Sequence, residues 1–213
     1  MQIIYRTWQD EIIDNHTTNY LVRAPRAAGK SYLCAKWAIS HIKLGRKVFW
    51  AFEDEHSFAY AITLVSRIAT EEGVLITGHG VNYTHFANGA RIFFFTLGTR
   101  SAVWSAGLDA DAIIYDDADL MDIEHQPYEW RNIRYKLLTA CDLDGFFYSV
   151  RNLMPEFVYK EFDYLHVIQS GIRTQDFYDK IKANMTEEQF QIEFGPWTNG
   201  NARHASVLER YDA

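Results

Sequence analysis

Apolar and polar residues alternate along the chain in blocks that fit short strands followed by helices. Residues 20–22 are an apolar run of strand length, and residues 29–45 repeat apolar side chains at helical spacing. Residues 47–52 form a second strand-length run, and residues 57–70 again have a helical pattern. Two successive strand–helix units predict an α/β fold with a mostly parallel sheet.

The next block is typical of an antiparallel hairpin. Residues 74–77 and 82–86 lead to Asn88-Gly89, and residues 91–96 read as the returning strand. Asn-Gly is the strongest short-range signal for a hairpin turn. We expect this hairpin at the edge of the sheet.

The remaining elements are predicted from shorter patterns. Trp130, Ile133 and Leu137 share one face of a helical segment, and Thr186 to Gln189 form a capping box that opens a short helix. The other predictions are a short helix over residues 8–13, a helix over 127–139, a buried strand over 112–115, another over 146–149 and a last strand over 164–169.

Composition narrows the class of protein. A chain of 213 residues with 48% hydrophobic residues fits one globular domain with a sizeable core. No apolar stretch is long enough to cross a bilayer, and Cys34 and Cys141 lack a paired spacing, so we expect two reduced, buried thiols. The net charge of −7 argues against a surface coated for nucleic acid, so any contact with DNA must be local.

The loop between the first strand and its helix has the residues of a phosphate-binding loop. Backbone N–H groups and the helix N-terminus would face an anion, Lys30 would reach the outer phosphates, and Ser31 would complete a magnesium shell. A strict motif has Gly where this chain has Ala24, and an ordinary strand-to-helix turn is the alternative reading. The residues expected to bind nucleotide are Ala24, Pro25, Arg26, Ala27, Ala28, Gly29, Lys30 and Ser31.

Three further positions carry candidate chemistry. Asp116 and Asp117 follow an apolar strand, which puts two carboxylates at the edge where α/β sheets bind ligands. Asp116 would hold Mg²⁺ through water, and Asp117 would orient or deprotonate the attacking water. Gln9 offers a donor and an acceptor that match the edge of adenine, although a solvated helix Gln is the plainer interpretation.

Together with Phe146 to Ser149, these motifs resemble the ATPase domain of tailed-phage terminase large subunits. The resemblance implies a RecA-like (ASCE) P-loop ATPase with a mostly parallel central sheet, helices on both faces and an edge hairpin. In that family the loop carries an Arg before Gly-Lys-Ser, as Arg26 does here, and tolerates a non-Gly first position. The resemblance also implies that Gln9 reads adenine and that Ser149 couples hydrolysis to movement.

The implied function is ATP hydrolysis that powers translocation of double-stranded DNA into a viral capsid. The resemblance implies ATP and Mg²⁺ as cofactors, and double-stranded DNA, a portal protein and a terminase small subunit as partners. It further implies a homo-oligomeric ring in the host cytoplasm, with no membrane contact. Arg26 or Arg100 would act as the arginine finger, and Arg100 is the candidate for action on a neighbouring subunit. Arg26 as a plain loop charge is the alternative.

The resemblance covers residues of about 5 to 197. We therefore expect an ATPase domain over 1–197 and a tail, or the start of a linker, over 198–213. The nuclease domain that usually follows is missing, so the chain is either an excised domain or a natural short form.

Two other functions stay open, and the second of them is favoured by Asp117, which stands where the family usually has Glu. One alternative is a helicase-like or remodelling nucleic-acid ATPase. Another is a degenerate nucleotide-binding module that holds ATP as a structural ligand.

Overall fold

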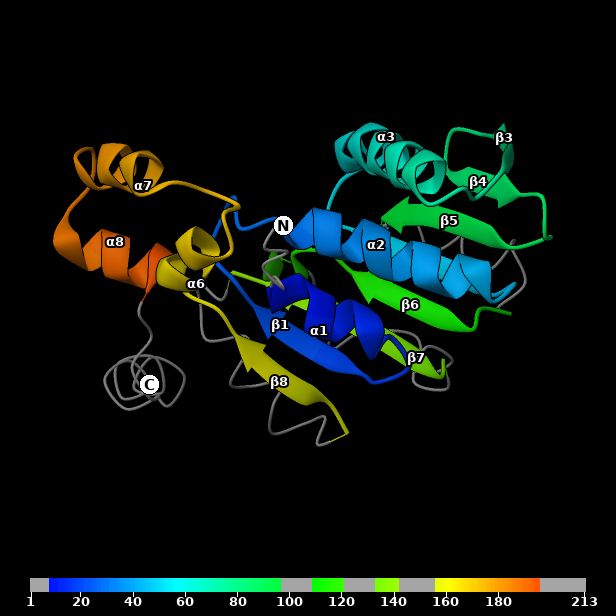
Figure 1. The fold of residues 1–213 in the computed structure, drawn as a ribbon, viewed down its shortest axis with the longest axis horizontal. Helices are drawn as coiled ribbons and strands as arrows, with labels where there is room; N and C mark the ends of the chain where they lie inside the picture. Colours follow the sequence, from blue (N-terminus) through cyan, green and yellow to red (C-terminus); the bar gives the residue numbers. More distant parts are fainter. Residues whose placement is uncertain (1–7, 97–108, 121–132, 142–155, 196–213) are drawn as a thin grey trace, which may run out of the picture.

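An eight-stranded sheet in the order β3-β4-β5-β2-β6-β7-β1-β8 forms the centre of the molecule (Figure 1). The computed structural model describes residues 8–96, 109–120, 133–141 and 156–195. The pairs β3·β4 and β4·β5 are antiparallel, and the other pairs are parallel. The strands are β1 (Tyr20–Arg23), β2 (Lys47–Phe52), β3 (Ile76–His79), β4 (Tyr83–Phe86), β5 (Arg91–Thr96), β6 (Ala112–Tyr115), β7 (Tyr135–Ala140) and β8 (Val158–Glu161).

The helices lie in two places. Helices α1, α2 and α3 cover one face of the sheet, whereas α6, α7 and α8 lie beyond the carboxyl ends of the parallel strands (Figure 1). None of the helices in the described part of the chain is long and apolar enough to span a membrane. The helices are α1 (Trp8–Asp14), α2 (Lys30–Lys43), α3 (His56–Glu71), the short 3-10 helix η1 (Ala118–Leu120), α6 (Tyr164–Gln169), α7 (Gln175–Lys182) and α8 (Glu187–Phe194).

The interior strands β2, β6 and β7 bury both of their faces, which explains their nearly continuous apolar runs. In β2, Val48 and Trp50 pack in the same cluster as the helices, whereas Phe49 and Ala51 pack in a separate cluster on the opposite face. This alternation is the period of a pleated strand, and burial on both faces is characteristic of parallel sheets. The predicted α/β class with a mostly parallel sheet is confirmed.

The hairpin, the capping box and the two cysteines also agree with the sequence-based predictions. Strands β4 and β5 pair antiparallel around a turn in which Gly89 has φ 84°, and the hairpin occupies one edge of the sheet. The predicted capping box is present, with both of its hydrogen bonds between Thr186 and Gln189. Cys34 and Cys141 are buried free thiols, as expected.

The predicted helix over 127–139 is wrong where it can be checked, because Tyr135 to Thr139 lie in strand β7. The spacing of Ile133 and Leu137 also fits a helix, but Leu137 and Leu138 point to opposite faces of the sheet, and both are buried. A short apolar run buried on both sides is the pattern of an interior parallel strand. Residues 127–132 lie outside the described part of the chain.

The predicted last strand over 164–169 is also wrong, because these residues form α6. The Asp163 side chain accepts a hydrogen bond from the backbone N–H of His166, and this N-cap starts a helix despite the apolar residues that follow. The last strand is β8 instead, which pairs parallel with β1 at the other edge of the sheet. The predicted strand over 146–149, with Ser149, and the candidate Arg100 lie outside the described residues.

Candidate functional site

The loop between β1 and α2 holds the predicted phosphate-binding residues. Ala24 is buried, and its N–H donates to the Ala140 carbonyl at 3.0 Å, which extends the β1–β7 pairing by one residue. Among the described non-glycine residues, only Ala27 and Asp117 have positive φ, so the backbone at Ala24 does not require glycine. The departure from the strict motif is therefore compatible with the loop.

Gly29 is the loop position that does require glycine. Its φ is 88°, and a Cβ built there would lie 2.8 Å from Nε2 of Gln9. Gln9 itself is buried, and its amide donates to the Gly29 carbonyl at 3.0 Å. In this conformation Gln9 fixes the loop from α1, and its contact with adenine stays a prediction.

Lys30 bends back over its own loop. Its Nζ donates to the carbonyls of Ala24 and Pro25, both at 3.4 Å, and to Sγ of Cys141 at 2.8 Å. It also forms an ion pair with Asp117 at 3.2 Å. Burial disfavours the ammonium, but Asp117, Cys141 and Asp116 together outweigh this effect, so the pKa of Lys30 is raised and the side chain stays charged.

Strand β7 lies between β1 and β6 and supplies the residue that organises the two acids. The Thr139 hydroxyl donates to Oδ1 of Asp116 at 2.9 Å and accepts from the backbone N–H of Asp117 at 3.1 Å. Asp116 is buried, and the Ser31 side chain also hydrogen-bonds to it. Burial and the nearby Asp117 charge raise the pKa of Asp116 to about 6.

Asp117 differs from its neighbour in both backbone and exposure. Its φ is 56°, a region that Asp tolerates better than most residues, and its side chain is 43% exposed. Its carboxylate faces the cleft and pairs with Lys30. Asp119 also lines the cleft, and it accepts a hydrogen bond from the backbone N–H of Cys141 at 3.1 Å. Asp116 is therefore buried among hydrogen-bond partners, whereas Asp117 is partly exposed to the cleft.

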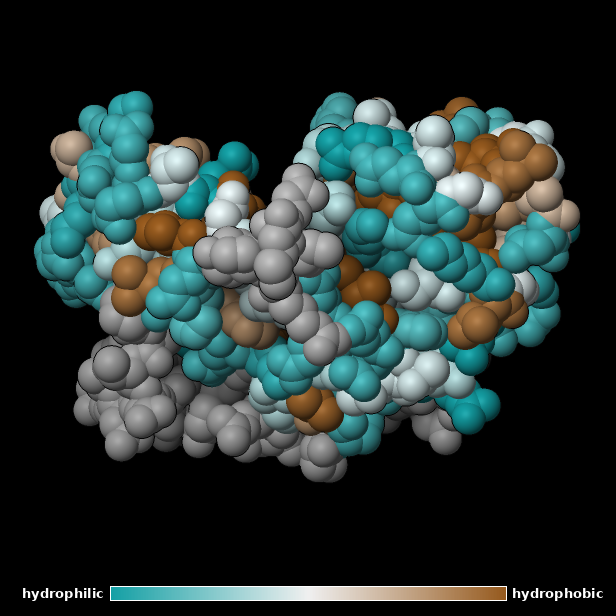
Figure 2. All heavy atoms as spheres, viewed as in Figure 1, coloured by the Kyte–Doolittle hydropathy of each residue, from teal (hydrophilic) through white to brown (hydrophobic). Residues whose placement is uncertain are grey.

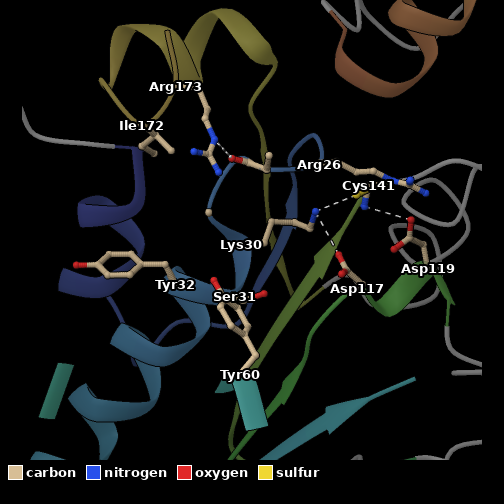
Figure 3. A pocket seen from close by; sticks show the side chains of 12 residues that line it. Arg26, Lys30, Ser31, Tyr32, Tyr60, Asp117, Asp119, Cys141, Ile172 and Arg173 are labelled. Atoms are coloured by element: carbon tan, nitrogen blue, oxygen red, sulfur yellow. Dashed lines mark hydrogen bonds and ion pairs between the residues drawn. The ribbon is translucent and has the colours of Figure 1, made fainter. Parts of the chain in front are cut away.

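A cleft of about 450 Å³ lies in front of these residues. Figure 2 shows the surface hollowed between the C-terminal helices and α3, and Figure 3 shows the lining side chains. Its size is in the range of small-molecule sites. Of the predicted site residues, the cleft brings together Arg26, Ala27, Gly29, Lys30, Ser31 and Asp117.

Several residues of the site were missed by the sequence analysis. Thr139 and Cys141 were overlooked because their strand was read as a helix, although a buried run ending in Thr-Ala-Cys-Asp is itself a strand signal. Arg173 and Ile172 line the cleft from the loop between α6 and α7. No local pattern in the sequence points to these two residues.

The oxygen atoms at the end of β6 fit a magnesium ion bound together with phosphates. Ser31 and Asp116 place a hydroxyl and a carboxylate side by side, and both are hard oxygen donors. In the described part of the chain, no group of three or more His, Cys, Asp or Glu side chains could hold a metal ion. A usual Mg²⁺ site takes one or two protein ligands and completes its shell with phosphate and water.

Solved structures of phage packaging proteins have the same fold. The large terminase from a thermophilic bacteriophage, in complex with ADP, matches with a TM-score of 0.63 and 11% identity, over 87% of this chain and 51% of that chain. The Thermus phage P74-26 large terminase ATPase domain matches with a TM-score of 0.59 and 13% identity, over 83% of this chain and 86% of that chain. No protein-family model matches the chain, and no curated protein sequence matches it significantly.

These matches confirm the RecA-like fold that the sequence resemblance implied. The chain covers 51% of the large terminase solved with ADP, which is about half of that protein's length. That terminase has also been solved in complex with ATP-gamma-S, in a structure that matches with a TM-score of 0.58 and 12% identity, over 84% of this chain and 47% of that chain. At such identities the likeness establishes the fold alone.

Proposed function

We propose that this chain is an ATPase that powers the movement of double-stranded DNA into a viral capsid. The observation that carries the proposal is that a phosphate loop meets two acids at the end of β6. Asp117 lines the cleft 3.2 Å from Lys30, and the buried Asp116 is hydrogen-bonded to Ser31 behind it. The fold shared with phage large terminase ATPase domains favours packaging among the many uses of this core.

In the proposed reaction, the backbone N–H groups of the loop and the Lys30 ammonium hold the phosphates of ATP. Ser31 and Asp116 would hold Mg²⁺, which would supply positive charge to the phosphates. Asp117 orients the attacking water and accepts its proton. The γ-phosphoryl group passes from the bridging oxygen of the β-phosphate to that water, so that ADP and inorganic phosphate are the products. Because Lys30 pairs with Asp117 in the present conformation, binding of ATP must draw Lys30 towards the phosphates and free the Asp117 carboxylate.

An arginine completes the charge stabilisation in this proposal. Arg26 is exposed in the loop and lines the cleft, so it would act within its own subunit. Arg100 would act from a neighbouring subunit of a ring. Mixed rings of Arg100→Ala and Lys30→Ala subunits should then recover activity that neither variant has alone, whereas an arginine acting in cis gives no rescue.

The remaining parts of the proposal follow the family resemblance. Residues 1–197 form the ATPase domain, Gln9 reads adenine, and Ser149 couples hydrolysis to movement. The assembled ring works in the host cytoplasm with a portal protein and a terminase small subunit.

A steady-state phosphate-release assay, with and without double-stranded DNA, tests the function. We expect Mg²⁺-dependent release from ATP that DNA stimulates and that Lys30→Ala abolishes. Turnover stimulated by single-stranded nucleic acid alone would favour a helicase-like or remodelling ATPase.

A second candidate is a module that binds ATP without turnover, and the geometry of Asp117 favours it. Asp117 is shorter than the usual Glu, has a positive φ of 56°, and is paired with Lys30. Tight binding of ATP with no phosphate release under any condition would identify this module.

A further inference from the structure

The loop between α6 and α7 reaches across the cleft to the phosphate loop. Nε of Arg173 donates a hydrogen bond to the Ala27 carbonyl at 3.2 Å, although the two residues are 146 positions apart in the sequence. Ile172 lies beside it, with its Cγ2 3.9 Å from the position a Cβ would take at Gly29. The loop between α6 and α7 therefore contacts the phosphate loop directly (Figure 3).

The Arg173 guanidinium is held in place without being neutralised. The residue is exposed, and in Figure 3 its side chain points into the cleft, on the side of Ser31. The Phe177 ring of α7 lies 5.0 Å from the centre of the guanidinium. Within the residues that the structure describes, no carboxylate forms an ion pair with Arg173, so its positive charge is available to a ligand.

The backbone on both sides of Arg173 is fixed. Gly171 has φ 70°, and the N–H of Ile172 donates to the Val167 carbonyl at 3.2 Å, which ends α6. Thr174 is the N-cap of α7, and its hydroxyl accepts from the N–H of Phe177 at 3.3 Å. Arg173 therefore extends from a short, well-braced turn, which is how proteins position a ligand-binding side chain.

A bound nucleotide would give the cleft an excess of negative charge, which another cation would offset. Lys30 already faces the Asp117 carboxylate, and a nucleoside triphosphate would bring several negative charges into the same space. A guanidinium offers several N–H donors in a planar fork that matches phosphate oxygens. Because only Nε of Arg173 is used by Ala27, the two terminal nitrogens remain to bind phosphate.

We propose that Arg173 binds the phosphate chain of the nucleotide from the same subunit and thereby ties the position of α6 and α7 to the nucleotide state. This inference rests on the proposed function, because it assumes that a nucleotide occupies the cleft. Arg173 is distinct from the finger candidates Arg26 and Arg100. Its contact with Ala27 in this conformation keeps the guanidinium at the entrance of the phosphate site.

The test measures the affinity of the full chain for ATP-gamma-S and ADP by calorimetry, with Arg173→Ala, Arg173→Lys and the control Lys180→Ala. Lys180 lies on α7, the helix that follows Arg173, pairs with Asp176 at 2.6 Å and does not line the cleft. We expect Arg173→Ala to bind ATP-gamma-S about tenfold more weakly, which is the loss of about one charge-assisted hydrogen bond. Arg173→Lys should recover part of the affinity, and Lys180→Ala should equal the wild type.

Hydrogen exchange of the C-terminal helices supplies a readout that a purely structural contact would not change. Saturating ATP-gamma-S should increase protection of α6 and α7 in the wild type but not in Arg173→Ala at a concentration that saturates the variant. Equal affinity and equal protection in Arg173→Ala would overturn the proposal while leaving the proposed function intact. Equal weakening in Lys180→Ala would also overturn it, since net charge would then explain the loss. A wild type that binds no nucleotide would overturn both.

Discussion

The two walls of the cleft are built in different ways. The wall formed by the sheet is buried and tightly hydrogen-bonded, with the Thr139 hydroxyl bridging Asp116 and the N–H of Asp117. Fewer side chains are buried in the wall formed by the C-terminal helices, where the buried hydrophobic residues described are Val167 of α6, Tyr178 of α7, and Phe190 and Phe194 of α8. Its helices depend on their N-caps and on aromatic contacts such as the one between Tyr164 and Tyr178.

This difference suits the sheet wall to precise positioning of side chains and the helical wall to movement. Side chains that must hold phosphate and metal within tenths of an ångström belong on a rigid scaffold. Elements with few buried contacts open at lower free energy than the core and can move without unfolding it. The following predictions test whether the sheet wall carries the chemistry and whether the helical wall, apart from Arg173, contributes only local stability.

The largest effect is expected for Lys30→Ala, which should abolish ATP turnover. The substitution removes the ammonium that faces the phosphates, but it also removes a buried charge, so the thermal midpoint without nucleotide should hardly change. Phosphate release and calorimetric unfolding measure the two quantities. Turnover at the wild-type rate would contradict the phosphate-loop assignment.

Substitution of Asp116 and of Asp117 should have different effects on ATP binding and turnover. Asp117→Asn should lose about two powers of ten in turnover while it still binds ATP, because it removes the group that handles water. Asp116→Asn should mainly weaken Mg²⁺-dependent binding. If both variants lose binding to the same extent, the roles shift by one position, with Asp117 on the metal and Asp119 as the base.

The buried carboxyl of Asp116 should also give the protein a distinctive pH dependence. Its pKa is raised from 3.8 to about 6, so between these values the folded protein holds a proton that the unfolded chain has released. The contribution of Asp116 to stability therefore falls as the pH rises through this window, by on the order of 3 kcal/mol. Urea unfolding should show that the stability of Asp116→Asn relative to the wild type rises between pH 4 and about 6. Above pH 6 the difference in unfolding free energy should stay constant.

The stability contribution of His41 changes with pH in the opposite direction to that of Asp116, so the test must compare the variant with the wild type. Burial, together with the His16 and Arg46 charges, lowers the pKa of His41 from 6.5 to about 3. The unfolded chain then binds a proton that the folded protein does not, so the contribution of His41 rises with pH over this range. Because both proteins contain His41, its effect cancels in the difference, and a flat difference would contradict the Asp116 assignment.

A smaller effect is expected for Thr139→Val, which removes the bridge between the acids. Loss of the hydroxyl leaves buried polar groups without a partner, at about 1–3 kcal/mol of unfolding free energy, and should lower turnover about tenfold. The matched control is Thr84→Val in the antiparallel hairpin, where the buried hydroxyl contacts His79 at 3.1 Å. The control should lose stability but not turnover per folded molecule.

The smallest effect is expected in the helical wall. Thr186→Ala removes the capping box of α8 and should cost about 1 kcal/mol. Hydrogen exchange should increase in α8 while turnover stays unchanged. A tenfold loss of turnover would show that this wall takes part in the chemistry beyond Arg173.

The sequence predicted the parts of the site that local chemistry determines. Residues 24–31 and Asp116-Asp117 were identified because a phosphate loop and a strand ending in acids are contiguous patterns. The sheet class and the hairpin followed from periodicity and from Asn88-Gly89. These features do not depend on which strands become neighbours.

The rest depends on topology, which no local pattern contains. Cys141 contacts Lys30 across 111 residues because β7 is inserted between β1 and β6. Leu137 fits a helical face and a strand equally well, and α6 is decided by the Asp163 cap against an apolar run that favours a strand. Arg173 reaches the loop only because α6 and α7 lie beyond the ends of the strands.

The bent Lys30 side chain has a consequence for the rate of binding. Its ammonium already has two carbonyls, a thiol and a carboxylate as partners, so an arriving phosphate exchanges these contacts and does not enter an unoccupied charge field. Since the Lys30 side chain is only 7% exposed, dissolved salt screens its ion pair weakly. We therefore expect the association rate to be limited by release of Lys30 from Asp117, and to depend more strongly on temperature than on ionic strength.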